Sequence, residues 1–236
     1  MLQGIFNFVP TILDMNFYSK ILLVSTLMMY PFIVKAQDTS GKQVGNPPVF
    51  METFVGNRAL AYQMIINKKL QTFPKLGFFS VTNCQPVWKE PKMNDYMVQG
   101  NLTYRIIRGI DLSGGFIWNP IDGIRPSAGA ILSYGNPQLL AVVNPRIDLT
   151  KKANFDVLTL LEYKPEINKV LSLYTRVQGL YTHNLGNDFH SRSYVMLRAG
   201  LTYKDISLGV AGNLDWYGPM KINKNNFGGF VAINLF

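Results

Sequence analysis

Charged residues are scarce in this sequence: Asp, Glu, Lys and Arg make up 16% of the chain, against roughly 25% in a typical soluble domain. A single cysteine, Cys84, excludes an internal disulfide framework and a cysteine-rich metal site. Beyond the N-terminus no apolar run reaches the length of about 20 residues that a membrane helix needs, which excludes a polytopic helical membrane protein. Hydrophobic residues still account for 47% and aromatic residues for 13%, so the composition is not that of a disordered chain.

The only long apolar stretch lies near the N-terminus. Residues 21–34 follow Lys20 and lead to a Val-Lys-Ala sequence just before Gln37. A basic residue, a short apolar core and a small residue at the cleavage site are the parts of a secretory signal peptide. We therefore predict a signal peptide at residues 1–36, with Met15 as the natural start, and an exported mature chain. An uncleaved anchor is the alternative.

The mature chain alternates between apolar and polar residues. Turn signals recur about every 10 to 15 residues, and between them the pattern has a period of two, which indicates β-strands. The clearest case is the segment 206–216, where one face holds apolar residues and the other holds small or polar ones. Segments 98–106 and 171–181 show the same division, and helical spacing fits none of the three.

Two all-β architectures produce such alternation. A soluble sandwich buries one face of each sheet and exposes the other to water, whereas a membrane barrel turns its apolar face to lipid and its polar face inward. The barrel is favoured because the strands are long, about 10 residues or more, and because their polar faces carry few Lys and Glu residues. Aromatic residues also gather near the expected strand ends, as in interfacial girdles: Trp118, Tyr134, Tyr163, Tyr181, Tyr203, Trp216 and Tyr217.

We predict a single antiparallel transmembrane β-barrel over residues 50–236, preceded by a periplasmic segment at 37–49. About 11 strands are evident, and because such barrels have an even number, a weak first strand at 49–57 would give 12; ten strands are the alternative. Longer polar segments are assigned to outer loops and tight connections to periplasmic turns. The loops are expected at 85–95, 119–126, 183–192 and 217–226, and the turns at 107–110, 134–138 and 204–206.

The chain resembles the outer-membrane β-barrel proteins of bacteria. The resemblance is carried by the signal peptide, the alternating strands and a last strand that ends on Phe236. Segments rich in Leu, Tyr and Arg, together with Tyr-Gly-Pro at 217–219, are similar to those of small barrels from Bacteroidota. The resemblance implies an outer-membrane location. It also implies a C-terminal signal for the barrel-assembly machinery, here Phe236 with Phe230.

The period of two also assigns a set of charged residues to the inside of the barrel. A Lys or Arg at the lipid-facing midplane would cost roughly 2–4 kcal/mol, so these charges are expected to face the lumen. We favour a salt-bridged filling because the charges balance; the protein is then non-enzymatic, with a structural or interaction role through its loops or a membrane partner. The alternative is a charged constriction in a narrow solute channel. The expected lumen charges are Arg105, Asp111, Arg146, Asp148, Glu162, Arg176, Arg198 and Asp215.

Catalysis has little support in the sequence. The two histidines, His183 and His190, fall in the expected loop at 183–192, where Ser191 follows His190. Outer-membrane lipid hydrolases place a histidine and a serine on one face of a strand, whereas adjacent residues of an extended strand point to opposite faces. A lipid-modifying enzyme is therefore only the second alternative. No spacing of His, Cys, Asp or Glu predicts a metal site, and no nucleotide-binding motif predicts a cofactor.

The chain is basic, with 23 Lys and Arg against 14 Asp and Glu. Nucleic acid is not an expected partner, because the lysines are scattered and the chain is exported. The expected partners are outer-membrane lipid and lipopolysaccharide, the barrel-assembly machinery during biogenesis, and a further membrane protein. The loop lysines either attract anionic lipopolysaccharide or are ordinary solvated charges: Lys89, Lys92, Lys151, Lys152, Lys221 and Lys224.

Overall fold

The computed structural model describes residues 46–89, 95–151 and 153–235. The signal peptide expected at 1–36, most of the periplasmic segment expected at 37–49 and the terminal Phe236 lie outside the described residues. In the part of the chain that is described, no helix is long and apolar enough to cross a membrane.

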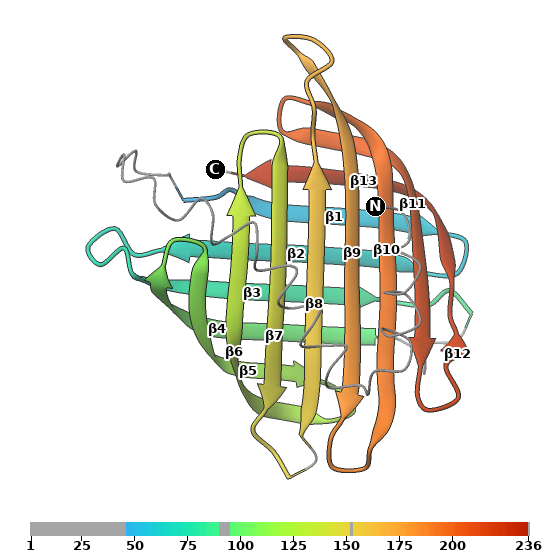
Figure 1. Cartoon of the computed structure of the whole chain (residues 1–236). Coiled ribbons are helices and arrows are strands. Elements are labelled where there is room, and N and C mark those ends of the chain that lie inside the picture. Colours follow the sequence, from blue (N-terminus) through green and yellow to red (C-terminus); the bar gives the residue numbers. More distant parts are fainter. Residues whose placement is uncertain (1–45, 90–94, 152, 236) are drawn as a thin grey trace, which may run out of the picture. The chain divides into compact units, whose positions relative to one another are not determined.

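In the described residues thirteen strands join into one antiparallel sheet, which can be followed by its colours in Figure 1. Twelve of them are long, and β12 has only two residues. The bounds are β1 Val49–Gly56, β2 Leu60–Lys69, β3 Leu76–Gln85, β4 Asp95–Ile107, β5 Ile110–Asn119, β6 Gly123–Gly135, β7 Leu139–Asp148, β8 Asn154–Tyr163, β9 Leu171–Asn184, β10 Phe189–Tyr203, β11 Ile206–Tyr217, β12 Ile222–Asn223 and β13 Asn226–Leu235.

The sheet closes on itself into a barrel. Consecutive strands from β1 to β11 pair with one another, and β13 pairs with β11 on one side and with β1 on the other, where Val49 lies opposite Leu235. Since β12 pairs only with the last two residues of β11, the wall consists of β1 to β11 and β13, twelve strands in all. The first strand expected at 49–57 is present as β1 and supplies the even number. The twelve-stranded barrel is thereby confirmed, and the ten-stranded barrel and the soluble sandwich are wrong.

The outer face of the wall is apolar and the inner face is largely polar, which is the reverse of a soluble protein. On β11, the outward side chains of Leu208 and Val210 are 57% and 68% exposed, while Ser207 and Asp215 face inward and are 2% exposed. The same division holds on most of the other long strands, where large apolar residues are exposed and Gln, Asn, Thr, Asp and Arg are buried. An apolar outer wall around a polar interior is the arrangement of a membrane-spanning barrel.

Glycines allow neighbouring strands to approach closely at the closing seam between β1 and β13. A Cβ atom on Gly228 would lie 1.9 Å from the carbonyl oxygen of Val55, so no other residue fits there without moving backbone. The adjacent Gly229 is different, since its nearest neighbour would be 3.4 Å away. One glycine of the pair is therefore required by strand packing and the other is not.

The connections fall into two sets, one at each end of the barrel. The loop end carries connections 57–59, 86–94, 120–122, 149–153, 185–188 and 218–225; the terminal end carries 70–75, 108–109, 136–138, 164–170 and 204–205, together with both ends of the wall.

The expected loops at 85–95 and 217–226 correspond to the two longest connections of the loop end. Those expected at 119–126 and 183–192 are present but shorter, at 120–122 and 185–188, because β6 already begins at Gly123 and β10 at Phe189. Polar residues in these segments belong to strands whose inner face is polar, so polarity alone did not mark a loop.

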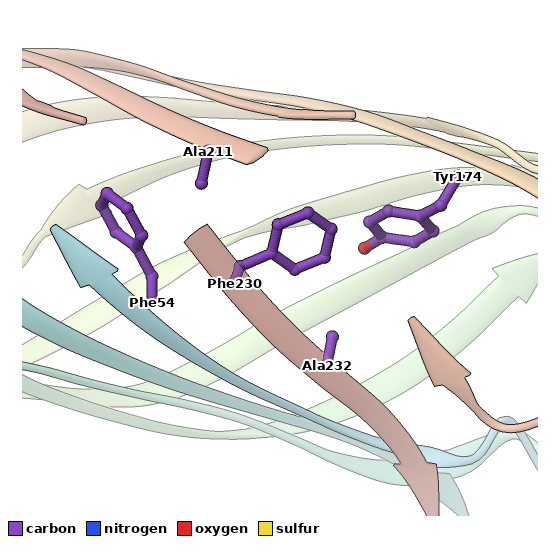
Figure 2. Packing of buried hydrophobic residues seen from close by; sticks show 5 residues of the cluster. All are labelled: Phe54, Tyr174, Ala211, Phe230 and Ala232. Carbon is purple, nitrogen blue, oxygen red and sulfur yellow. The ribbon is translucent and has the colours of Figure 1, made fainter. Parts of the chain in front are cut away.

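A small apolar cluster lies inside the barrel next to the charged residues. Figure 2 shows the ring of Phe230 between those of Phe54 and Tyr174, with Ala211 and Ala232 beside them. The Phe230 and Tyr174 ring centroids are 5.4 Å apart. Phe230, which the sequence suggested as part of an assembly signal, thus packs inside the lumen, and its role in assembly stays a prediction.

Candidate functional site in the lumen

The interior of the barrel is crossed by a buried ion pair between Arg198 on β10 and Glu52 on β1. The guanidinium donates to one carboxylate oxygen of Glu52 from Nε and Nη2, at 2.9 and 2.7 Å, and from Nη1 to Asn213 Oδ1 at 2.8 Å. Strands β11 and β13 separate the two elements in the sheet, so the contact spans part of the lumen. Both charges are about 95% buried, which makes each dependent on the other.

Arg176 is held differently, by neutral groups. Its Nη2 donates to Gln63 Oε1 and to Gln178 Oε1, both at 2.6 Å, and its guanidinium carbon lies 4.3 Å from the centre of the Phe50 ring. Among the described residues it forms no ion pair, although Glu162 is its register partner on β8. Arg176 therefore supplies a buried positive charge that no directly bonded carboxylate neutralises.

A third buried arginine, Arg146 on β7, joins two parts of the wall. Its Nε donates to Asp156 Oδ2 at 2.8 Å, and its Nη1 donates to Gln99 Oε1 on β4. All three side chains are nearly fully buried. Because β4 and β7 are three strands apart, this contact also braces the barrel from within.

The loop end holds a network that connects opposite walls. Arg192 on β10 pairs with Asp95 at the start of β4, at 2.5 Å, and with Asp215 on β11, at 2.8 Å. The Tyr217 hydroxyl donates toward the same two carboxylates at 3.1 Å. Strands β4 and β10 are six steps apart around a wall of twelve, so the Asp95–Arg192 pair crosses the full lumen. Tyr217, expected in an aromatic girdle, is thus an interior residue.

The eight charges expected to face the lumen all lie on the inner face of their strands, although the side chain of Arg105 is 42% exposed. Among the described residues only one contact joins two members of the set, Arg105 Nε to Asp111 Oδ1 at 3.5 Å. Five others pair outside the set: Arg146 with Asp156, Arg198 with Glu52, Asp148 with Arg125, Asp215 with Arg192, and Glu162 with Lys164.

Sequence reasoning missed several partners for identifiable reasons. Asp156 has the same parity as Glu162 on β8, so extending the period of two would have placed it inside. Arg125 and Arg192 fall in segments expected as outer loops, whereas the structure places them on β6 and β10. Glu52 gave no signal, because the strand around it is short and largely apolar on both faces.

A cavity of about 330 Å³ lies in the loop-end half of the barrel. Next to it is a constriction, formed by side chains that leave no room for a water molecule. Glu52, Gln63, Met196 and Arg198 line both, so the constriction borders the cavity. The constriction consists of Glu52, Gln63, Arg176, Gln178, Met196 and Arg198.

Several buried polar atoms around the cavity have no hydrogen-bond partner in the described part of the chain. Asp156 Oδ1 and Glu52 Oε2 are spare acceptors, and Asn213 Nδ2 and Arg125 Nε are spare donors. Buried polar groups are normally satisfied, by protein or by ordered water. The cavity thus offers both kinds of hydrogen-bonding group to water or to a polar solute.

The loop end also carries a perturbed lysine. Lys224 lies between β12 and β13, with its Nζ 4.3 Å from the centre of the Tyr217 ring. Partial burial lowers the pKa of this ammonium, and the neighbouring Arg58 guanidinium lowers the pKa further. The shift reports a partly buried lysine with a second cation nearby.

The histidines lie in strands rather than in a loop, with His183 on β9 opposite His190 on β10. Within the described residues, no group of three or more His, Cys, Asp or Glu side chains could hold a metal ion. Neither histidine lines the cavity or the constriction.

Comparison with known proteins gives a likeness of fold. No protein-family model matches the chain, and no curated protein matches it by sequence. Among solved structures, it is similar to the NanC porin, with 12% identity and a TM-score of 0.47 over 80% of this chain and 99% of that one. It is also similar, with the same coverage, to the KdgM porin (10%, 0.44) and to KdgM in complex with disordered oligogalacturonate (9%, 0.45). The likeness is to porins. At such identities the chemistry of the lumen has to be derived from this chain's own side chains.

Proposed function

We propose that the protein is an outer-membrane β-barrel that conducts small polar solutes through a narrow lumen. The apolar outer wall and polar inner wall support a membrane-spanning position, and the expected signal peptide supports export. The observation that carries the proposal is that the constriction beside the cavity consists of six side chains from four strands. Side chains change rotamer far more readily than backbone moves, so such a constriction opens without unfolding any part of the wall.

The charge at the constriction gives the proposed channel a preference for anions. Arg198 is neutralised by Glu52, whereas Arg176 is held by two amide oxygens and an aromatic ring. An anion that reaches the constriction therefore meets one positive charge without a directly bonded counter-ion. Fixed charge that lines a narrow pore can select ions by sign.

Single-channel recording of the folded protein in planar bilayers tests this function. We expect discrete openings and a reversal potential in a KCl gradient that shows chloride passing more easily than potassium. Arg176→Gln should lower the chloride preference at least about fivefold, because a unit charge 4 Å from the path is worth about 1 kcal/mol even at the dielectric constant of water. Arg108→Gln, an exposed arginine in the turn 108–109, is the matched control and should leave the preference unchanged.

A filled barrel with a structural or interaction role is the competing function, and the lack of room for water at the constriction favours it. The recording separates the two. A protein that is shown to be folded and inserted, yet passes no current, is a filled barrel that acts through its loops or a membrane partner. Openings with no preference for either ion would refute the assigned role of Arg176.

A further inference from the structure

A β-bulge changes which side chains of β10 share a face. His190 pairs with His183 and Arg192 pairs with Thr182, so Ser191 is an extra residue with no partner of its own on β9. In a regular strand, residues three apart lie on opposite faces. The extra residue brings His190 and Ser193 to the same face, where His190 Nε2 and Ser193 Oγ are 2.9 Å apart.

The hydrogen bonds around His190 fix its tautomer. Its Nδ1 lies 2.8 Å from the carbonyl oxygen of Gly218, which can only accept, so Nδ1 carries the proton. In the neutral ring Nε2 is then an acceptor and receives the hydroxyl proton of Ser193. The Gly218 carbonyl is itself fixed, since it also accepts from the Lys221 N–H at 3.0 Å and the Gly218 N–H donates to the Ser191 carbonyl at 2.8 Å.

The pair lies on the outer surface of the barrel, away from the lumen. Ser193 has the parity of Leu197 and Leu201, whose side chains are 42% and 41% exposed on the outer wall. Its register partners are Tyr181 on β9 and Trp216 on β11, and the Tyr181 ring lies 5.8 Å from the His190 ring. Tyr and Trp at the end of a barrel wall are typical of the membrane–water interface.

We propose that Ser193 and His190 form a catalytic pair that hydrolyses acyl esters of membrane lipids at the loop end of the barrel. A serine nucleophile with a histidine base, itself oriented by a third group, is the arrangement that acyl transfer requires. The ester linkages of membrane lipids lie at the depth where the aromatic residues hold this part of the wall. This activity is independent of conduction through the lumen.

The reaction balances with water as the only co-reactant. Ser193 Oγ forms a bond to the ester carbonyl carbon as His190 Nε2 takes its proton; the ester C–O bond then breaks, and His190 protonates the departing alcohol oxygen. Water next attacks the acyl-serine carbonyl while His190 takes a water proton. The Oγ–carbon bond breaks, Ser193 recovers its proton from His190, and a fatty acid leaves.

The test uses the full barrel refolded into two kinds of vesicle, one of phosphatidylethanolamine with phosphatidylglycerol and one that also contains lipid A. Fatty acid release is measured together with covalent labelling by a fluorophosphonate, with the labelled residue located by mass spectrometry. We expect release and labelling of Ser193, and the vesicle type that supports release identifies the ester source. Ser193→Ala and His190→Gln should each reduce release about 100-fold or more.

Ser191→Ala is the matched control, because it removes the neighbouring hydroxyl and keeps the bulge backbone, and it should retain both signals. Altered migration of unheated samples on gels verifies that each variant is folded. Wild-type protein that is folded but neither labels nor releases fatty acid from either vesicle overturns the proposal, whatever the variants do. Labelling at Ser191 instead of Ser193 overturns it as well.

Discussion

At the residue scale, the lumen contains buried charges that are tolerated only when each has a partner of opposite charge. Arg198 and Glu52 are both almost completely buried, and each is the other's only ion-pair partner among the described residues. Removing one member of such a pair leaves an uncompensated charge away from water, whereas replacing both with apolar residues of similar size costs far less. A single substitution in the pair should therefore cost more stability than replacement of both residues.

Glu52→Ala is expected to lower the free energy of unfolding by about 3–5 kcal/mol, because Arg198 is left buried and unpaired. Urea unfolding in lipid vesicles, followed by tryptophan fluorescence, measures the change. Glu166→Ala, at an exposed position in the connection 164–170, is the control and should change little. The double variant Glu52→Leu with Arg198→Met should recover most of the loss. A single variant as stable as the wild type would contradict the assigned dependence.

At the scale of elements, strand packing distinguishes residues that look alike in the sequence. Gly228 and Gly229 are adjacent glycines in β13, but only a Cβ atom on the first would clash with the backbone of a neighbouring strand. The same holds for Gly115, whose Cβ would lie 2.1 Å from the Gly100 carbonyl oxygen, and Gly114, which has open space. Which glycine of each pair matters follows from strand register, and no property of the sequence indicates it.

Gly228→Ala is expected to destabilise the barrel by roughly 1–3 kcal/mol or more, since a methyl group against a backbone carbonyl forces β1 and β13 apart. Gly229→Ala is expected to stay within about 0.5 kcal/mol of the wild type, as an ordinary exposed substitution does. Unfolding midpoints in urea compare the two variants directly. Equal losses would show that strand propensity, and not close packing at the seam, sets the cost.

The strands themselves could be predicted, and the irregularities within them could not. The period of two located β4, β9 and β11 and assigned the expected charges to the inner face, because alternation follows directly from strand geometry. The bulge at Ser191 has no composition of its own, so the sequence argued for opposite faces at His190–Ser191 and offered no reason to consider Ser193. The partners of the inward charges could not be predicted either, since they depend on which strands face each other across the barrel.

At the scale of the whole molecule, the barrel presents an apolar surface to its surroundings, and its depth in a membrane sets the cost of charge there. Val210 is 68% exposed near the middle of β11, while Tyr203 is 50% exposed at the terminal end of β10. In lipid these two positions differ in environment, but in water they would not.

Val210→Arg should lower the free energy of unfolding by roughly 2–4 kcal/mol in phosphatidylcholine vesicles. For Tyr203→Arg the cost of burying the charge should be about 0–1 kcal/mol, because this cost falls from the bilayer midplane to the interface. Equilibrium urea titration of both variants measures the difference. Similar, small costs at the two positions would show that water, and not lipid, surrounds the wall.

Closure of the barrel also explains why the contacts across the lumen could not be predicted from the sequence. The contact between Asp95 and Arg192 links strands on opposite sides of the ring, and the one between Arg176 and Gln63 links strands five steps apart. Such contacts exist only once twelve strands have fixed a diameter. A sequence that reveals each inward side chain therefore still leaves its partner across the lumen undetermined.

The seam between β1 and β13 has a consequence for how the chain reaches its folded state. Until the ten residues of β13 are in place, β1 and β11 are both edge strands, with unpaired backbone N–H and C=O groups beside an apolar face. Open edges of this kind pair with other chains and promote aggregation. A chain that stops short of β13 is therefore exposed to aggregation for its whole lifetime. The full chain has these open edges only until β13 pairs with β1 and β11. The faster the barrel closes, the less time the chain has to aggregate.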